Sequence, residues 1–207
     1  RGMRLRGGQI GSAALDAGNS GTTMRLLMGA LSSRPGNFCI DGDASLRRRP
    51  MGRVAVPLEA MGAKITLRRG CAPVQIEGAD LVGITYRSPV ASAQVKSAIL
   101  LAGLSAVGVT RFVEPVVSRD HTERMLRRMG ADLTVDGTAV AVRPGRIYPV
   151  DVTVCGDISA AAFPLILAAC VPGGRVTVKN VGVNPTRDGV LEVLRNAGTA
   201  VTFDNFA

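Results

Sequence analysis

The chain has 207 residues, of which 46% are hydrophobic, so it can bury one good core or two modest ones. It contains no run of about 18 apolar residues, which excludes a membrane-spanning helix, and its first residues lack the apolar segment of a secretory signal. The formal charge of +9 favours an anionic partner, but no Trp and two Tyr leave few platforms for stacking nucleic-acid bases. A genome biased toward Arg codons would give the same charge. We expect a cytosolic protein that binds neither membrane nor nucleic acid.

Residues 16–27 form a polar turn that runs into an apolar helical pattern. Asn19 or Ser20 is suited to cap this helix, and Gly21 lets a ligand approach the backbone closely. The free N–H groups of a first helical turn can donate to a negative group. The segment therefore fits an anion-binding helix start, but taken alone it favours the alternative of an ordinary capped helix, because Gly-rich helix starts are common.

A repeat organises the rest of the chain. Gly62, Gly130 and Gly198 lie at intervals of 68 residues, and each closes an amphipathic helical pattern. The pattern predicts a first helix in each unit, at residues 21–31, 93–104 and 159–169. It predicts strands before and after the second helix, at residues 37–41, 109–113 and 175–181 and at residues 63–67, 131–135 and 199–203.

The predicted fold class is therefore α/β (α+β), built from helix–strand–helix–strand units of about 68 residues. The helices of each unit should cover one face of a small sheet and pack against helices of the next unit. Residues 1–15 look like the tail of a preceding strand pair, and the alternating residues 145–155 predict a strand that leads into a crossover. We expect a lobe boundary near Val154 and a chain that starts and stops in mid-architecture.

Four cysteines, Cys39, Cys71, Cys155 and Cys170, are widely spaced and form no C-x-x-C pair. This spacing argues against a zinc site and against a disulfide framework. We expect free thiols, mostly in the core, and no metal or other cofactor.

Each predicted first helix begins with small polar residues, and each second helix begins beside an arginine, in the bends at residues 43–49, 118–120 and 186–188. If the units are related by rotation, their helix starts converge on one region. Such a region would bind a polyanionic small molecule.

Five motifs, in chain order, carry a family resemblance: LDAGNSGTTMRL (residues 15–26), DGDASLRRRPM (41–51), ASAQVKSA (91–98), SRDHTE (118–123) and GDIS (156–159). Together they resemble the 5-enolpyruvylshikimate-3-phosphate (EPSP) synthase family, and the Ser-Ala-Gln run is similar to that of bacterial members. The resemblance covers essentially the whole chain.

The resemblance implies a cytoplasmic, monomeric transferase that moves the enolpyruvyl group of phosphoenolpyruvate to shikimate 3-phosphate. The implied fold has two lobes, each with three similar units around a pseudo-threefold axis. Residues 1–154 would be most of the first lobe, with its N-terminal unit missing. Residues 155–207 would be the incomplete opening unit of the second lobe.

The motifs also imply site residues. Phosphoenolpyruvate would contact Gly21, Arg49 and Gln94, and the inhibitor glyphosate would lie at Gly21. Shikimate 3-phosphate would contact Thr22, Ser92, Ala93, Gln94, Ser118 and Arg119. The supporting residues would be Asn19, Arg25 and Asp157.

Several residues of these motifs also have structural interpretations. Ser118 is placed to cap the helix that follows it, His121 is expected to be structural, and Arg47 and Arg48 are expected to form a solvated face. The acid–base residues of the family are expected outside residues 1–207. The chain is therefore expected to be a fragment that is inactive alone.

Two alternatives remain open. The related UDP-N-acetylglucosamine enolpyruvyl transferase would show a cysteine near residues 43–49, where this sequence has none. A basic nucleic-acid-binding module of similar α/β units would bind with an affinity that falls steeply with salt.

Overall fold

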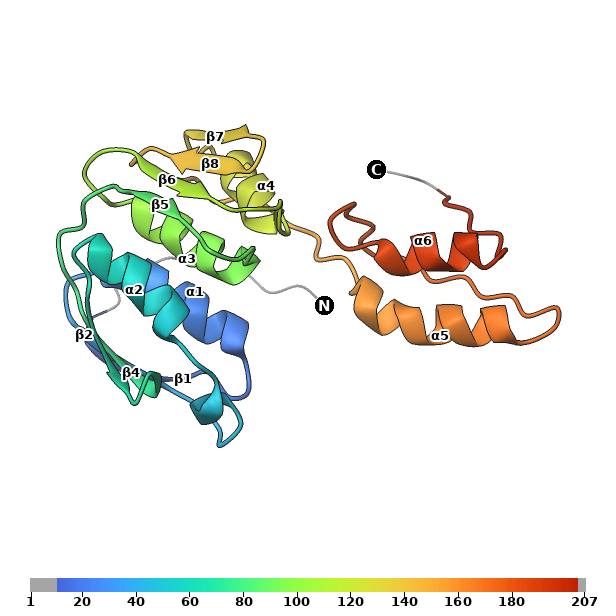
Figure 1. Ribbon diagram of the computed structural model, residues 1–207, viewed down its shortest axis with the longest axis horizontal. Helices are drawn as coiled ribbons and strands as arrows, with labels where there is room; N and C mark the ends of the chain where they lie inside the picture. The colour runs from blue at the N-terminus through green and yellow to red at the C-terminus, as the bar shows by residue number, and fades with distance from the viewer. Residues whose placement is uncertain (1–10, 205–207) are drawn as a thin grey trace. The chain divides into compact units, whose positions relative to one another are not determined.

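The computed structural model describes residues 11–204 (Figure 1). The chain divides into two compact units between Pro149 and Val150. The first unit carries two four-stranded sheets and four α-helices, and the second carries two α-helices, counted over the described residues.

The first unit contains two copies of one strand–helix–strand–helix–strand–strand motif. The first copy comprises β1 (Ala13–Asp16), α1 (Gly21–Ser32), β2 (Asn37–Asp41), the 3-10 helix η1 (Leu46–Arg48), α2 (Gly52–Ala60), β3 (Lys64–Arg68) and β4 (Cys71–Glu77). The second comprises β5 (Thr85–Arg87), α3 (Ala93–Gly103), β6 (Thr110–Val113), α4 (His121–Arg128), β7 (Leu133–Asp136) and β8 (Ala139–Val142). The sheet orders, β1-β2-β4-β3 and β5-β6-β8-β7, are equivalent. In each sheet the first strand pair is parallel and the other two are antiparallel.

The predicted repeat is confirmed at the ends of the second helices. Gly62, Gly130 and Gly198 follow α2, α4 and α6 (Gly189–Asn196) with φ of 100°, 83° and 84°. These are left-handed conformations, which glycine adopts without the steric cost of a Cβ. Glycine recurs at a fixed interval because the backbone adopts a left-handed conformation at the end of the second helix in each unit.

The predicted first-unit strands at residues 37–41, 63–67, 109–113 and 131–135 are present within a residue or two. Three strands were not predicted: β4, β5 and β8. Strands β4 and β8 follow tight turns at Gly70 and Gly137, which have positive φ. The dipeptide Asp136-Gly137 between two apolar runs is a hairpin signal from which β8 could have been predicted. Of the strand tail predicted at residues 1–15, residues 1–10 lie outside the described residues, and residues 13–16 form β1.

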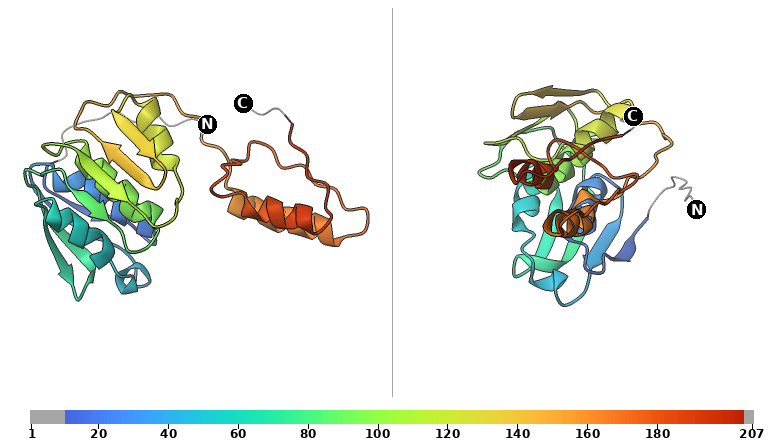
Figure 2. Two further views of the ribbon diagram at one scale, coloured as in Figure 1. Left: turned by 45° about the horizontal axis from the view of Figure 1, so that its top comes forward. Right: turned by 90° about the vertical axis from the view of Figure 1, so that its right-hand side faces the viewer.

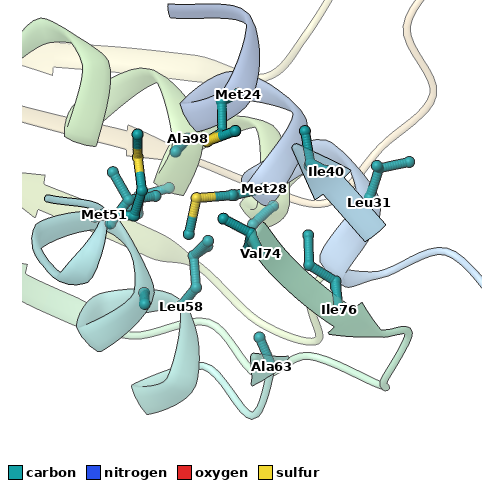
Figure 3. Packing of buried hydrophobic residues seen from close by; sticks show 14 of the residues in the cluster. Met24, Met28, Leu31, Ile40, Met51, Leu58, Ala63, Val74, Ile76 and Ala98 are labelled. Carbon is teal, nitrogen blue, oxygen red and sulfur yellow. The ribbon is translucent and has the colours of Figure 1, made fainter. Parts of the chain in front are cut away.

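The main core lies between the two sheets, where α1, α2 and α3 pack (Figures 1 and 2). Met24 and Met28 of α1 meet Val74 and Ile76 of β4 and Ala98 of α3 (Figure 3). All five are 2% exposed or less. Helices from both copies thus share one core, as the amphipathic patterns predict.

The second unit holds α5 (Ile158–Cys170) and α6 around a small cluster that includes Ile158, Ala161 and Leu191. The strands predicted at residues 145–155, 175–181 and 199–203 are wrong, because these residues form no ladder in the described chain. A single parallel bridge joins Gly156 to Val181. A β-pattern becomes a strand only where a neighbouring strand accepts its hydrogen bonds, and here the pairing stops at one bridge.

The cysteines also differ from expectation in part. All four are free, but Cys39 and Cys71 are half-buried and Cys155 and Cys170 are exposed. Cys39 and Cys71 belong to the strands β2 and β4, and Cys155 and Cys170 belong to the small second unit. The apolar character of a cysteine side chain is therefore not enough to place it in the core. No helix within residues 11–204 has the length and apolar character needed to cross a membrane.

Candidate functional site

The starts of α1 and α3 form the centre of the candidate site. The Ser20 hydroxyl caps α1 by accepting from the Thr23 N–H at 3.1 Å. The Ser92 hydroxyl caps α3 by accepting from the Val95 N–H at 3.4 Å. Ser20, rather than Asn19, is therefore the cap of α1. Both helices direct the positive ends of their dipoles toward this part of the first unit.

Gln94 joins the two helix starts. Its Oε1 accepts from Arg25 Nη1 at 2.7 Å, and its Nε2 donates to Thr22 Oγ1 at 2.7 Å. Arg25 also donates to the carbonyl of Pro50 at 3.2 Å. Because a guanidinium has no acceptor, the Arg25 contact fixes which end of the Gln94 amide faces Thr22.

Asn19 reaches the site through its side chain. Its Oδ1 accepts from Arg49 Nη2 at 2.7 Å, and its Nδ2 donates to Asp43 Oδ2 at 2.6 Å. The hydrogen bond from Asn19, aided by the backbone N–H of Leu46, lowers the pKa of Asp43. The Asp43 carboxylate accepts from the Leu46 N–H at 2.7 Å. This contact lies at the start of the 3-10 helix η1, which ends just before Arg49.

Two guanidinium groups converge on Gly21, the buried first residue of α1. A Cβ placed on Gly21 would lie 2.8 Å from Arg25 Nη1 and 3.4 Å from Arg49 Nη1. Burial, and then the charges of Arg53 and Arg49, lower the pKa of Arg25. An anion bound here would relieve this repulsion, so the arrangement favours a small, highly charged anion.

Ser118 and Arg119 lie in the turn that precedes α4. Arg119 is exposed, and Ser118 is half-buried. The cap of α4 is Asp120, so Ser118 does not have the capping role considered above, and His121 is an exposed first helical residue. Beneath the turn, Lys96 is 1% exposed and pairs with Glu114 and Glu123. Burial raises the pKa of Glu114, but hydrogen bonds from Ser118 and Lys96 outweigh it and leave this pKa lowered.

The structure joins the predicted residues Asn19 and Arg49 by one hydrogen bond, and Thr22, Arg25 and Gln94 by two more. Ser92 and Ala93 lie at the start of α3, beside Gln94. Asp157 belongs to the second unit, where it caps α5 by accepting from the Ser159 N–H at 2.9 Å and pairs with Arg187 at 3.3 Å. Arg48 is exposed as expected, and Arg47 is exposed but pairs with Asp41 at 2.6 Å.

Sequence reasoning missed four residues around the site: Asp43, Lys96, Glu114 and Glu123. The signal for Lys96 was available, since a lone charge within the apolar run of α3 needs a buried partner. Glu114 gave the same signal, because it is a lone charge between Val113 and the apolar residues 115–117. Glu123 gave no such signal, because it lies in an ordinary polar segment. Over residues 11–204, no group of His, Cys, Asp or Glu is arranged to hold a metal ion.

These features define a class of protein: a repeated α/β fold that gathers capped helix starts and guanidinium groups at one position, an arrangement suited to binding a small anion. Comparison with known proteins assigns the family. Residues 5–207 match the family model of EPSP synthase (3-phosphoshikimate 1-carboxyvinyltransferase), and the chain belongs to this family.

Named relatives agree with the assignment. The chain is 55% identical over 206 residues to 3-phosphoshikimate 1-carboxyvinyltransferase of Synechococcus sp., covering 95% of this chain and 47% of the relative. It is 53% identical over 197 residues to the protein of the same name from Geobacillus kaustophilus, covering 94% of this chain and 46% of the relative. A solved EPSP synthase from Acinetobacter baumannii matches with a TM-score of 0.80 and 49% identity, over 88% of this chain and 42% of that one. The chain thus spans about half the length of these relatives.

Proposed function

We propose that the site serves the reaction named for the family. In that reaction the enolpyruvyl group of phosphoenolpyruvate passes to the 5-hydroxyl of shikimate 3-phosphate, and phosphate is released. The observation that carries the proposal is the convergence of Arg25 and Arg49 on the side-chain-free start of α1. Two guanidinium groups beside a helix N-terminus suit a ligand that carries both a phosphate and a carboxylate.

The predicted residues of the first unit receive binding or supporting roles in this proposal. Arg49 holds phosphoenolpyruvate, Gly21 leaves room for it, and Gln94 lies between the two substrates. Shikimate 3-phosphate is held by residues that, except for Ala93, carry hydroxyl or other polar side chains: Thr22, Ser92, Ala93, Gln94, Ser118 and Arg119. Asn19 and Arg25 hold Arg49 and Gln94 in place through the hydrogen bonds described above.

The chemistry sets what these residues contribute. The enol methylene must gain a proton and the attacking hydroxyl must lose one, which is the work of positioned acids and bases. Guanidinium, amide and hydroxyl groups instead bind the substrates, orient them and neutralise the phosphate that leaves. We assign this part of the reaction to the site residues of this chain.

The wider setting follows from the same proposal. We infer a cytoplasmic enzyme whose partners are its two small-molecule substrates, with no cofactor and a monomeric state. We assign residues 1–154 to the first lobe of a two-lobed fold and residues 155–207 to the second.

Arg49 provides the direct test. Isothermal titration of shikimate 3-phosphate, then of phosphoenolpyruvate, into the 207-residue chain should show binding of both. We expect Arg49→Ala to weaken phosphoenolpyruvate binding by about 1.5–3 kcal/mol, roughly 10- to 100-fold, because a charged hydrogen-bond donor is lost. The exposed neighbour variant Arg48→Ala removes the same charge and should bind like the parent.

Two results would contradict the proposal. One is a parent chain that binds neither substrate, and the other is equal binding by the Arg49 and Arg48 variants. Titration with an unrelated RNA at two salt concentrations completes the experiment. Tight RNA binding that collapses at high salt, without any response to shikimate 3-phosphate, would favour the nucleic-acid-binding alternative.

A further inference from the structure

A buried charge cluster lies beneath the candidate site. Lys96 of α3 is 1% exposed, and Glu114 and Glu123 are each 3% exposed. Lys96 Nζ lies 2.9 Å from Glu114 Oε1 and 2.7 Å from Glu123 Oε1. Charges are costly to remove from water, and a buried ion pair is often no more stabilising than apolar side chains of the same volume. The contacts of this cluster therefore need an explanation other than stability.

The cluster holds one residue, Ser118, by both polar groups of its backbone. Glu114 Oε1 accepts from the Ser118 N–H at 2.8 Å. Lys96 Nζ donates to the Ser118 carbonyl at 3.3 Å. Together these contacts fix the orientation of the turn between β6 and α4, which also carries Arg119.

Helix α3 links this turn to the rest of the site. Ser92, Ala93 and Gln94 occupy its start, and Lys96 and Ser97 follow within the next turn of the helix. Ser97 Oγ also lies 2.6 Å from Thr122 Oγ1 of α4. The start of α3 and the Ser118 turn are thus held at a set separation by side chains of one helix.

The Ser118 hydroxyl is buried beside the Glu114 carboxylate, whose pKa it helps to lower. Its Oγ makes no hydrogen bond of ordinary geometry within residues 11–204, although both backbone groups of the same residue are engaged. Burying a hydroxyl without a hydrogen bond costs free energy, and a bound ligand that forms this hydrogen bond would remove the cost.

We propose that Lys96 and Glu114 are positioning residues for the phosphorylated substrate. They hold the Ser118 turn against α3, so that the Ser118 hydroxyl and Arg119 meet the same ligand as Ser92 and Gln94. The inference rests on the proposed function, because it takes shikimate 3-phosphate as that ligand. Glu123 completes the charge pairing of Lys96 but makes no hydrogen bond to Ser118 among the described contacts.

A matched set of variants of the 207-residue chain separates the effect of the length of the Glu114 side chain from the effect of its charge. Glu114→Asp keeps the charge but withdraws the acceptor from the Ser118 N–H. Glu114→Gln keeps the acceptor in place but removes the charge. Glu123→Asp shortens the other carboxylate on the same lysine and serves as the control.

Two measurements are made on each variant. Titration with shikimate 3-phosphate gives the affinity, and the Ser118 amide in a ¹H–¹⁵N spectrum reports the hydrogen bond to Glu114. We expect Glu114→Asp to bind at least tenfold more weakly and to shift the Ser118 amide upfield in ¹H. Glu114→Gln and Glu123→Asp should stay within threefold of the parent in affinity.

Equal losses of affinity in Glu114→Asp and Glu123→Asp would overturn the inference, because they would show a general effect on folding. An unchanged affinity in Glu114→Asp would overturn it as well. If the parent chain does not bind shikimate 3-phosphate, the proposed function fails, and the Ser118 amide still shows whether Glu114 holds the turn. If Glu114→Asp does not fold, the hydrogen-exchange rate of the Ser118 amide in the parent chain tests the inference instead. The inference requires the Ser118 amide to exchange more slowly than those of Val116 and Val117, and equal rates overturn it.

Discussion

Gly21 contributes to the site through the side chain it lacks. The space above its Cα is occupied by the guanidinium of Arg25, whose Nη1 also donates to Gln94. The sequence predicted that Gly21 lets a ligand approach the backbone closely, so that a methyl group here would intrude on that ligand. The structure adds a more specific consequence, because the methyl group would first displace Arg25 and so disturb the orientation of the Gln94 amide.

The variant Gly21→Ala should therefore fold and bind anions poorly. A Cβ 2.8 Å from Arg25 Nη1 cannot be accommodated without movement, but the far end of a flexible side chain can move. We expect titration to show phosphoenolpyruvate and glyphosate binding weakened by about 1–2 kcal/mol, from a lost hydrogen bond and a partly filled site. Gly189→Ala is the control, since Gly189 also begins a helix and its added Cβ would meet open space. Anion binding equal to that of the parent would show that Arg25 does not need this space.

At the scale of elements, the contact between α1 and α3 decides where the site residues meet. Gly29 of α1 packs directly on the backbone of α3, where a Cβ would lie 2.0 Å from the carbonyl oxygen of Ala98. Such a close approach brings Thr22 and Gln94, one or two turns earlier in each helix, within hydrogen-bond distance. A glycine that weakens an isolated helix is thus what lets two helices form one site.

Gly29→Ala should destabilise the protein although alanine is the better helix former. Alanine would gain about 1 kcal/mol of intrinsic helix propensity, but the clash with a backbone atom forces the helices apart, and overpacking of this kind costs about 1–3 kcal/mol or more. Urea unfolding should show a net loss of stability for Gly29→Ala and none for Gly52→Ala, whose Cβ meets open space at the start of α2. A more stable Gly29→Ala protein would mean that the two helices pack less closely than described.

At the scale of the whole molecule, the two compact units differ in how much apolar surface they bury. In the first unit, Met24, Met28 and Ile40 are fully buried. In the second, Phe163 and Leu167 of α5 are 80% and 66% exposed. Because burial of apolar surface is the main favourable term in folding, the first unit should be much the more stable of the two.

This difference predicts two separate unfolding units. Met28→Ala should cost about 2–5 kcal/mol and lower hydrogen-exchange protection only in the first unit, since it leaves a cavity in that core. Leu191→Ala should lower protection only in the second unit, whose cluster includes Leu191. Hydrogen-exchange mass spectrometry of peptides from residues 11–149 and 150–204 measures both effects. A loss of protection in both units from either substitution would show that the chain unfolds as one.

Much of the local structure follows from the sequence, for reasons that particular residues make clear. Ser20, Ser92 and Asp157 cap helices whose starts were predicted, and Gly62, Gly130 and Gly198 end helices where a left-handed residue is required. These signals are local, because each depends on backbone groups only a few residues away. The predicted strands of the second unit failed because a strand depends on a partner that its own residues do not specify.

The site divides in the same way between sequence and tertiary structure. The sequence by itself determined the repeat, the helix starts and the motifs that place the chain in the EPSP synthase family, because all of these are written in residue type and spacing. Only the tertiary structure decided that Gln94 bonds to Arg25 and Thr22, that Asn19 holds Arg49, and that Lys96 and Glu114 hold Ser118. Except for Glu114 and Ser118, which are four residues apart, these partners lie far apart along the chain. Their contacts depend on how closely α1, α3 and α4 pack, which no local pattern specifies.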